Sequence, residues 1–114
     1  MSANNHLSKP GSEGVQRHLD RAEVLTSTVA QLRKDLAMGE HELPAPAVGE
    51  GAFEARRTDV LVRLEELDRT GASALQSAMY RVDIPEAHLR RTLAAGGLHA
   101  LAGECVLRAL QKVL

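Results

Sequence analysis

Apolar residues recur between positions 15 and 36 at alternating steps of three and four residues. This spacing places side chains on one face of an α-helix and resembles the seam of a coiled coil about three heptads long. We therefore expect a long heptad-like N-terminal helix that ends at Gly39 with a left-handed C-cap. The stripe, called here the N-terminal seam, consists of Val15, Ala22, Leu25, Val29, Leu32 and Leu36. His18 falls in the same register.

Four further segments show helical spacing of apolar residues. Residues 40–51 contain two prolines and two glycines that oppose helix continuation, so they are expected to form a connector. Breaks at Thr70–Gly71 and at Gly96–Gly97 then separate helices predicted over about 52–69, 72–81, 84–95 and 98–113. The pattern predicts a small bundle of about five helices.

A local signal for a helix start lies at residues 83–86. Asp83 can accept hydrogen bonds from the free N–H groups of a new helix, and Pro85 suits a first helical turn. Glu86 follows Asp83 by three residues, as in a capping box. We expect Asp83 to be the N-cap of the fourth helix.

Composition supports an all-α fold. Leu and Ala supply 17 residues each, whereas the aromatic residues are only Phe53 and Tyr80. Leu and Ala favour helices, and β-rich domains carry more aromatic and β-branched residues. The 14 basic and 15 acidic residues give a net charge of -1, which provides no field for non-specific nucleic acid binding.

The domain organisation and cellular context follow from simple features. Residues 1–14 are polar and are expected to be a disordered tail, leaving a single helical domain over 15–114. The only cysteine is Cys105, so an intramolecular disulfide is excluded and a reducing compartment is favoured. The sequence shows neither a signal-peptide apolar region nor an obvious membrane span. We expect a cytoplasmic protein.

The string from Ala78 to Glu86 resembles a motif of a group of small uncharacterised bacterial helical proteins. The usual form in that group is Leu-Tyr-Arg-Ile-Asp-Val-Ser-Glu, which corresponds here to Met79 through Glu86. The resemblance covers roughly residues 55–113, and Pro85 replaces the serine of the group. It implies a helical fold and no particular chemistry.

Tyr80, Arg81, Asp83 and Glu86 form the most notable polar cluster in the sequence. In one interpretation they form a recognition surface, with Arg81 as a planar donor and Tyr80 as a rigid contact. In the other, which spacing alone favours, Tyr80 packs against the bundle, Arg81 pairs with Asp83 or Glu86, and the two acids cap the following helix.

A second interpretation concerns the predicted helix over 84–95. His88, Arg90 and Arg91 follow a short helix and a tight break, which is the order found in a helix-turn-helix. Because the net charge is near zero and Pro85 lies in the break, we prefer a solvated helix face. DNA binding through this helix is kept as the alternative function.

Catalytic, cofactor and metal sites are not indicated. None of the histidines has a His or Cys at the i+3 or i+4 spacing of a helical metal site. Cys105 is expected to be buried apolar filler. The histidines are His6, His18, His41, His88 and His99. We therefore expect a protein that is not an enzyme and that has no cofactor and no metal.

Helix-mediated association is the preferred function. The N-terminal seam can pack on its own chain, which is the commoner outcome, or it can mediate self-association. The hypothesis is a non-catalytic helical protein that binds itself or a protein partner, with homo-oligomerisation possible. Nucleic acid and membrane partners are not expected.

Overall fold

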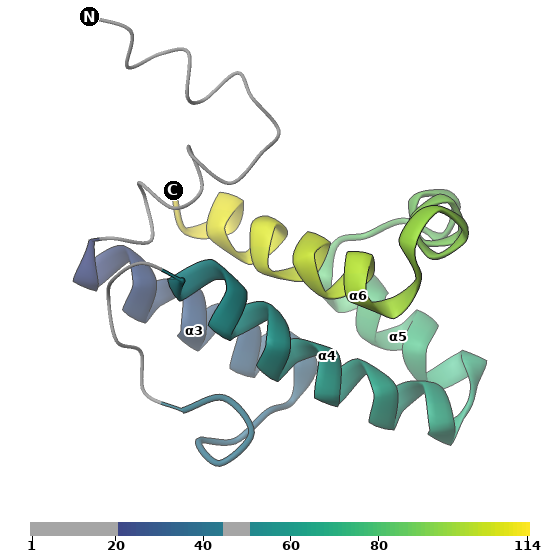
Figure 1. The fold of residues 1–114 in the computed structure, drawn as a ribbon, viewed down its shortest axis with the longest axis horizontal. Helices are drawn as coiled ribbons and strands as arrows, with labels where there is room; N and C mark the ends of the chain where they lie inside the picture. The colour runs from purple at the N-terminus through teal and green to yellow at the C-terminus, as the bar shows by residue number, and fades with distance from the viewer. Residues whose placement is uncertain (1–20, 45–50) are drawn as a thin grey trace, which may run out of the picture.

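The computed structural model describes residues 21–44 and 51–114. All regular secondary structure in these residues is helical, which confirms the all-α class. The helices are α3 (Ala22–Leu36), α4 (Ala52–Thr70), α5 (Ala72–Val82) and α6 (Glu86–Val113) (Figure 1). The expected tail at 1–14, together with Val15 and His18, lies outside the described residues.

The prediction of about five helices with a long first helix is not matched. The described part of the chain contains four helices, and α3 is 15 residues long from Ala22. The segments predicted as separate helices over 84–95 and 98–113 both lie within α6, on the two sides of Gly97. The backbone of Gly97 is not helical, so the predicted break is present as a sharp kink between two helical stretches.

The bend in α6 divides it into two arms. Gly97 has φ 66° and ψ -160°, a conformation that is essentially restricted to glycine. We call residues 86–96 the first arm and residues 98–113 the second arm. Figure 1 shows the two arms running in different directions, with the first arm on the side of the molecule that carries α5. The bend therefore sets where the first arm lies.

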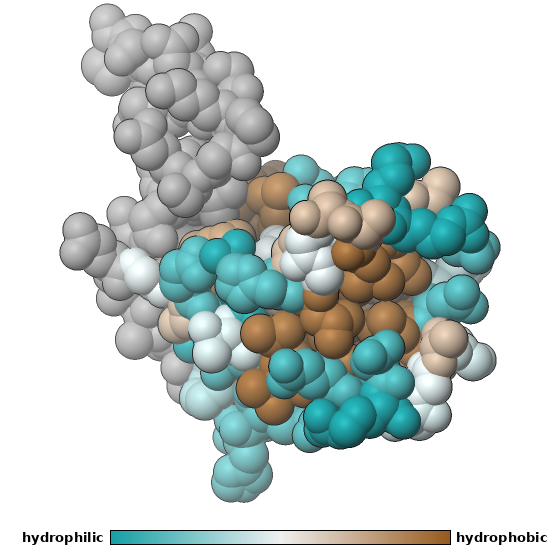
Figure 2. Space-filling view, turned by 45° about the vertical axis from the view of Figure 1, so that its right-hand side comes forward, coloured by the Kyte–Doolittle hydropathy of each residue, from teal (hydrophilic) through white to brown (hydrophobic). Residues whose placement is uncertain are grey.

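A single apolar core holds the helices together. α6 packs against both α3 and α4, and α5 contacts α3, α4 and α6. The largest fully buried side chains include Leu32 of α3, Leu64 of α4 and Leu101 of α6. Burial of each such leucine contributes about 1.5–3 kcal/mol to folding. Figure 2 shows that apolar side chains also reach the surface on one side, surrounded by hydrophilic ones.

The N-terminal seam is part of this core. Leu25, Val29, Leu32 and Leu36 are buried within the single chain, whereas Ala22 is exposed. Their spacing puts them on the face of α3 that packs on α5 and α6. Of the two alternatives for the seam, these four residues follow the commoner one, packing on their own chain.

The C-terminal end of α3 differs from the expected Gly39 cap. The helix ends at Leu36, and the left-handed residue is Ala37, with φ 53°. The backbone N–H of Met38 donates to the Arg33 carbonyl at 2.9 Å. Met38 is buried in the core, which offsets the strain of a left-handed alanine. The cap is decided by this apolar contact and not by the glycine.

Candidate functional site

Three adjoining pockets meet where α5 turns into α6. All three are lined by Ile84, and two of them are also lined by Tyr80 and Pro85. Their volumes are about 210, 260 and 350 Å³. We call residues 80–86 the corner. It coincides with the motif string singled out in the sequence.

Two backbone hydrogen bonds hold the corner in a tight turn. The Asp83 N–H donates to the Tyr80 carbonyl at 3.1 Å, and the Ile84 N–H donates to the Met79 carbonyl at 2.9 Å. Asp83 has φ 72° and is the left-handed C-cap of α5. These bonds complete the last turn of α5 and turn the chain sharply into α6.

The predicted capping box is wrong. Asp83 ends α5 and does not begin α6, whose N-cap position is Pro85 with no side-chain cap hydrogen bond. The Asp83 carboxylate lies 3.7 Å from Lys112 Nζ and 3.9 Å from Arg108 instead. Glu86 pairs with Arg90 at 2.9 Å. Asp83 therefore faces cations of the second arm and does not cap the N-terminus of α6.

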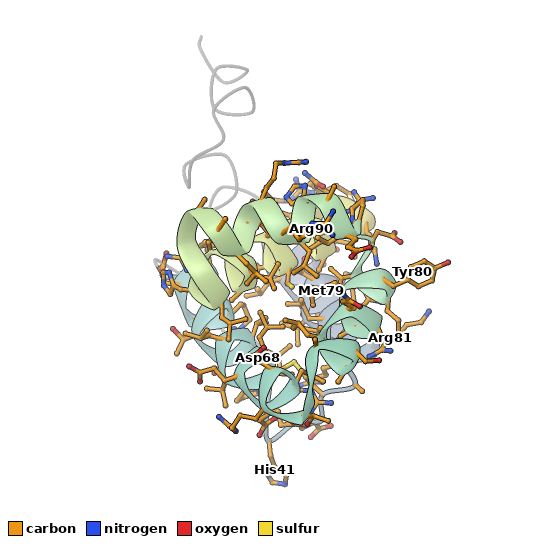
Figure 3. The ribbon with its side chains drawn as sticks, turned by 90° about the vertical axis from the view of Figure 1, so that its right-hand side faces the viewer. His41, Asp68, Met79, Tyr80, Arg81 and Arg90 are labelled. Carbon is orange, nitrogen blue, oxygen red and sulfur yellow. The ribbon has the colours of Figure 1, made fainter. Side chains whose placement is uncertain are left out.

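Tyr80 projects into solvent. Its side chain is 84% exposed, and Figure 3 shows it pointing away from the body of the molecule. The interpretation in which Tyr80 packs against the bundle is therefore incorrect. Tyr80 occupies the last turn of α5, one residue after the buried Met79, so helix geometry turns it outward.

Arg81 has a structural role that spacing did not predict. Its Nε donates to the Asp35 carbonyl at 2.9 Å, and it makes no ion pair with Asp83 or Glu86. Arg63 Nε donates in the same way to the Leu36 carbonyl at 2.9 Å. Both guanidinium groups satisfy carbonyls at the C-terminal end of α3, where the helix dipole favours a cation.

A buried ion pair, which the apolar spacing did not predict, lies behind the corner. Lys112 Nζ on α6 lies 2.7 Å from Asp35 Oδ2 on α3, with side chains 17% and 8% exposed. Lys112 also donates to the Arg81 carbonyl at 3.0 Å, and Gln31 donates to Asp35 at 3.1 Å. In the sequence, the pair was indicated only by the position of Asp35, which directly precedes Leu36 on the apolar stripe of α3.

The 260 Å³ pocket lies between the two arms of α6 and is polar. His88 Nε2 on the first arm lies 3.2 Å from Glu104 Oε1 on the second arm. Asp83, Arg108 and Gln111 complete its polar lining. The pocket brings together charges of both signs, but it offers no arranged nucleophile with a base.

Arg90 and Arg91 are exposed on the first arm, as the DNA-binding interpretation requires. Arg90, however, forms the surface ion pair with Glu86, and His88 faces Glu104. Two of the three predicted phosphate-contacting residues therefore already face carboxylates.

Cys105 is buried on the second arm. Burial raises the pKa of its thiol to about 12, and the nearby carboxylates of Glu104 and Asp35 add to the shift. Its Sγ lies 3.8 Å from Met79 Sδ. A neutral thiol in an apolar setting is inert as a nucleophile. Within residues 21–44 and 51–114, no group of three or more His, Cys, Asp or Glu residues could hold a metal ion.

α6 is the one helix among the described residues that is long and apolar enough to cross a membrane. The core helices of soluble proteins can reach the same length and hydropathy, and the second arm of α6 is part of the core.

Comparison of the chain with protein-family models, curated proteins and solved structures gave no match.

Proposed function

We propose that this chain is a non-catalytic helical protein that binds protein partners through the corner, with Tyr80 as the central contact. The observation that carries the proposal is a tyrosine 84% exposed beside pockets of about 210 and 350 Å³. Tyrosine is among the residues that dominate binding energy in protein interfaces.

The rigidity of the corner supports this function. Capping bonds hold the backbone around Asp83, and the side chains of Arg81 and Lys112 tie the end of α5 to α3. A contact residue on a fixed backbone loses little conformational entropy on binding. The corner therefore fixes the backbone that carries Tyr80, which leaves only its side chain to be ordered on binding.

Two other proposals have less support. Association through the N-terminal seam would require α3 to leave its own core, because Leu25, Val29, Leu32 and Leu36 are buried there. DNA binding would require Arg90 and His88 to exchange Glu86 and Glu104 for phosphates. An absence of salt-dependent duplex binding at low ionic strength would end the DNA proposal.

Site-specific photo-crosslinking tests the proposed surface. A photoreactive phenylalanine analogue replaces Tyr80 in cells of the source organism, and the adducts are identified by mass spectrometry. We expect a discrete adduct, because the ring at this position is buried in the complex. The adduct should form again with the purified partner.

Val62 provides the matched control. It is an exposed apolar residue of α4, 53% exposed, and it lines none of the three pockets. The same analogue at position 62 should not give the adduct. Equal adducts from both positions, or none from position 80, would remove the corner as the binding surface.

A further inference from the structure

We infer that the partner at the corner is a second copy of this chain, bound so that Tyr80 of each copy enters the 210 Å³ pocket of the other. This inference rests on the proposed binding role of the corner. The observation behind it is that the exposed side chain of Tyr80 lies directly beside a pocket whose floor is apolar.

The pocket matches a tyrosine ring in size and chemistry. Its floor is apolar, since Ile84 and Leu89 are only 5% and 4% exposed, and Pro85 forms one wall. A cavity of about 150 Å³ is enough to bind benzene. The amide of Gln76 and the carboxylate of Glu86 line the same pocket and can bond a phenolic hydroxyl.

A projection beside a matching pocket is self-complementary. In a twofold dimer, residue i of one copy contacts residue j of the other, and j contacts i in return. Tyr80 itself lines the pocket, so its protruding side chain and the pocket adjoin each other. A twofold axis that passes near Tyr80 therefore brings the tyrosine of each copy to the pocket of the other. One symmetric contact then fills both pockets at once.

The charges around the corner also suit a second copy. Asp83 and Glu86 present carboxylates that are 58% and 61% exposed, and Arg90, which is 70% exposed, pairs with Glu86 at 2.9 Å within the chain. This pair balances one of the two carboxylates, so the corner is not strongly one-signed and does not repel a second copy through a large like charge.

The contact is small, so the dimer should be weak. Two buried tyrosines and the surrounding corner fall below the roughly 1,200 Å² of a stable standard interface. Dimerisation should therefore appear only at the upper end of a concentration series that runs from micromolar to millimolar protein.

Tyr80 provides its own reporter for the experiment. It is the only tyrosine of a chain without tryptophan, so intrinsic fluorescence of the full chain comes essentially from the corner. We expect acrylamide quenching of Tyr80 to decrease as protein concentration rises. Sedimentation equilibrium over the same series should show a monomer–dimer equilibrium.

Two variants identify the interface. Gln76→Arg fills the pocket with a long charged side chain and keeps the fluorophore, and we expect at least tenfold weaker dimerisation. Ser77→Arg introduces the same side chain and the same change in charge at an exposed position that lines none of the three pockets. It should dimerise like the unchanged chain. Tyr80→Ser, followed by sedimentation alone, should weaken dimerisation about thirtyfold or more.

Circular dichroism establishes that each variant is folded. Dimerisation that is equal in Gln76→Arg and Ser77→Arg would overturn the proposed interface. A chain that stays monomeric, with concentration-independent quenching, would overturn the second copy as the partner. In that case an adduct of Tyr80 with a different protein would still support the proposed function, so the two proposals fail separately.

Discussion

At the scale of single residues, the most consequential pair is Asp35 and Lys112. The two side chains link α3 to the last turn of α6 at 2.7 Å, and both are largely buried. Removal of one partner of a buried pair leaves an uncompensated charge, which costs more than the pair itself contributes. The pair therefore secures the end of α5 and the corner as well, through the Lys112 bond to the Arg81 carbonyl.

Lys112→Met should destabilise the protein by about 2–3 kcal/mol. This lies below the roughly 3–5 kcal/mol found for fully buried pairs, because the Asp35 carboxylate that is left behind keeps its hydrogen bonds from Gln31. Urea unfolding followed by circular dichroism measures the change. The double variant Asp35→Asn/Lys112→Met should be more stable than Lys112→Met, since it removes the unpaired charge. Equal stability of the two variants would contradict this account.

At the scale of elements, the bend in α6 decides where the corner lies. The first arm bears Leu89, part of the floor of the pocket beside Tyr80, and the second arm bears Lys112 behind the corner. A straight α6 could not place both around the end of α5. The bend at Gly97 is thus the element-level feature on which the candidate site depends.

Gly97→Ala should lower the free energy of unfolding by about 1–3 kcal/mol, because a Cβ is strained at φ 66° and ψ -160°. Thermal or urea unfolding provides the measurement. Gly39→Ala is the control, since the nearest atom to its added Cβ is 3.9 Å away and its φ is not positive. Its effect should stay within about 0.5 kcal/mol. Similar losses for both variants would show that the bend carries no special strain.

At the scale of the whole molecule, Cys105 reports on the integrity of the core. It is fully buried on the second arm, beside Met79 of α5. Reagents can reach the thiol only when these helices separate. Its reactivity therefore follows the opening of the whole bundle and not of the corner alone.

Cys105 should resist aromatic disulfide reagents at pH 8 in the native state and react rapidly in denaturant.

The raised pKa of the Cys105 thiol also predicts that the stability of the protein depends on pH. The folded thiol has a pKa of about 12 against an ordinary 9.0, so the unfolded chain loses this proton first. Stability from this group is present below pH 9 and falls as pH rises towards 12, by at most about 1.4 kcal/mol per pH unit.

The control for this prediction is Cys105→Ala, which removes the thiol while other groups still titrate. Subtraction of its pH profile from that of the unchanged chain isolates the contribution of Cys105. Rapid labelling of the native protein would show that the thiol is accessible. Identical pH profiles for the unchanged chain and Cys105→Ala would show that the pKa of the thiol is not raised by folding.

Much of the fold was predictable, because helices follow local rules. The predicted limits of α4 and α5 agree with the structure to within one residue at each end, since apolar spacing and the break at Gly71 act locally. Asp83 and Ala37 were misassigned for the opposite reason. Asp83 lies beside Lys112 and Arg108, which are far along the chain, and the side chain of Met38 is buried in the core next to the left-handed Ala37. Neither contact is visible in the local sequence.

The candidate site shows the same division. The sequence marked the motif string that contains Tyr80, but it favoured a packed ring, and it did not reveal Asp35 or Lys112, which are 77 residues apart. Helical class, the positions of the breaks and the apolar faces are set by the sequence itself, because they depend on neighbours within four residues. The exposure of Tyr80, the buried ion pair and the pockets were decided by tertiary packing, because each depends on which helix faces another.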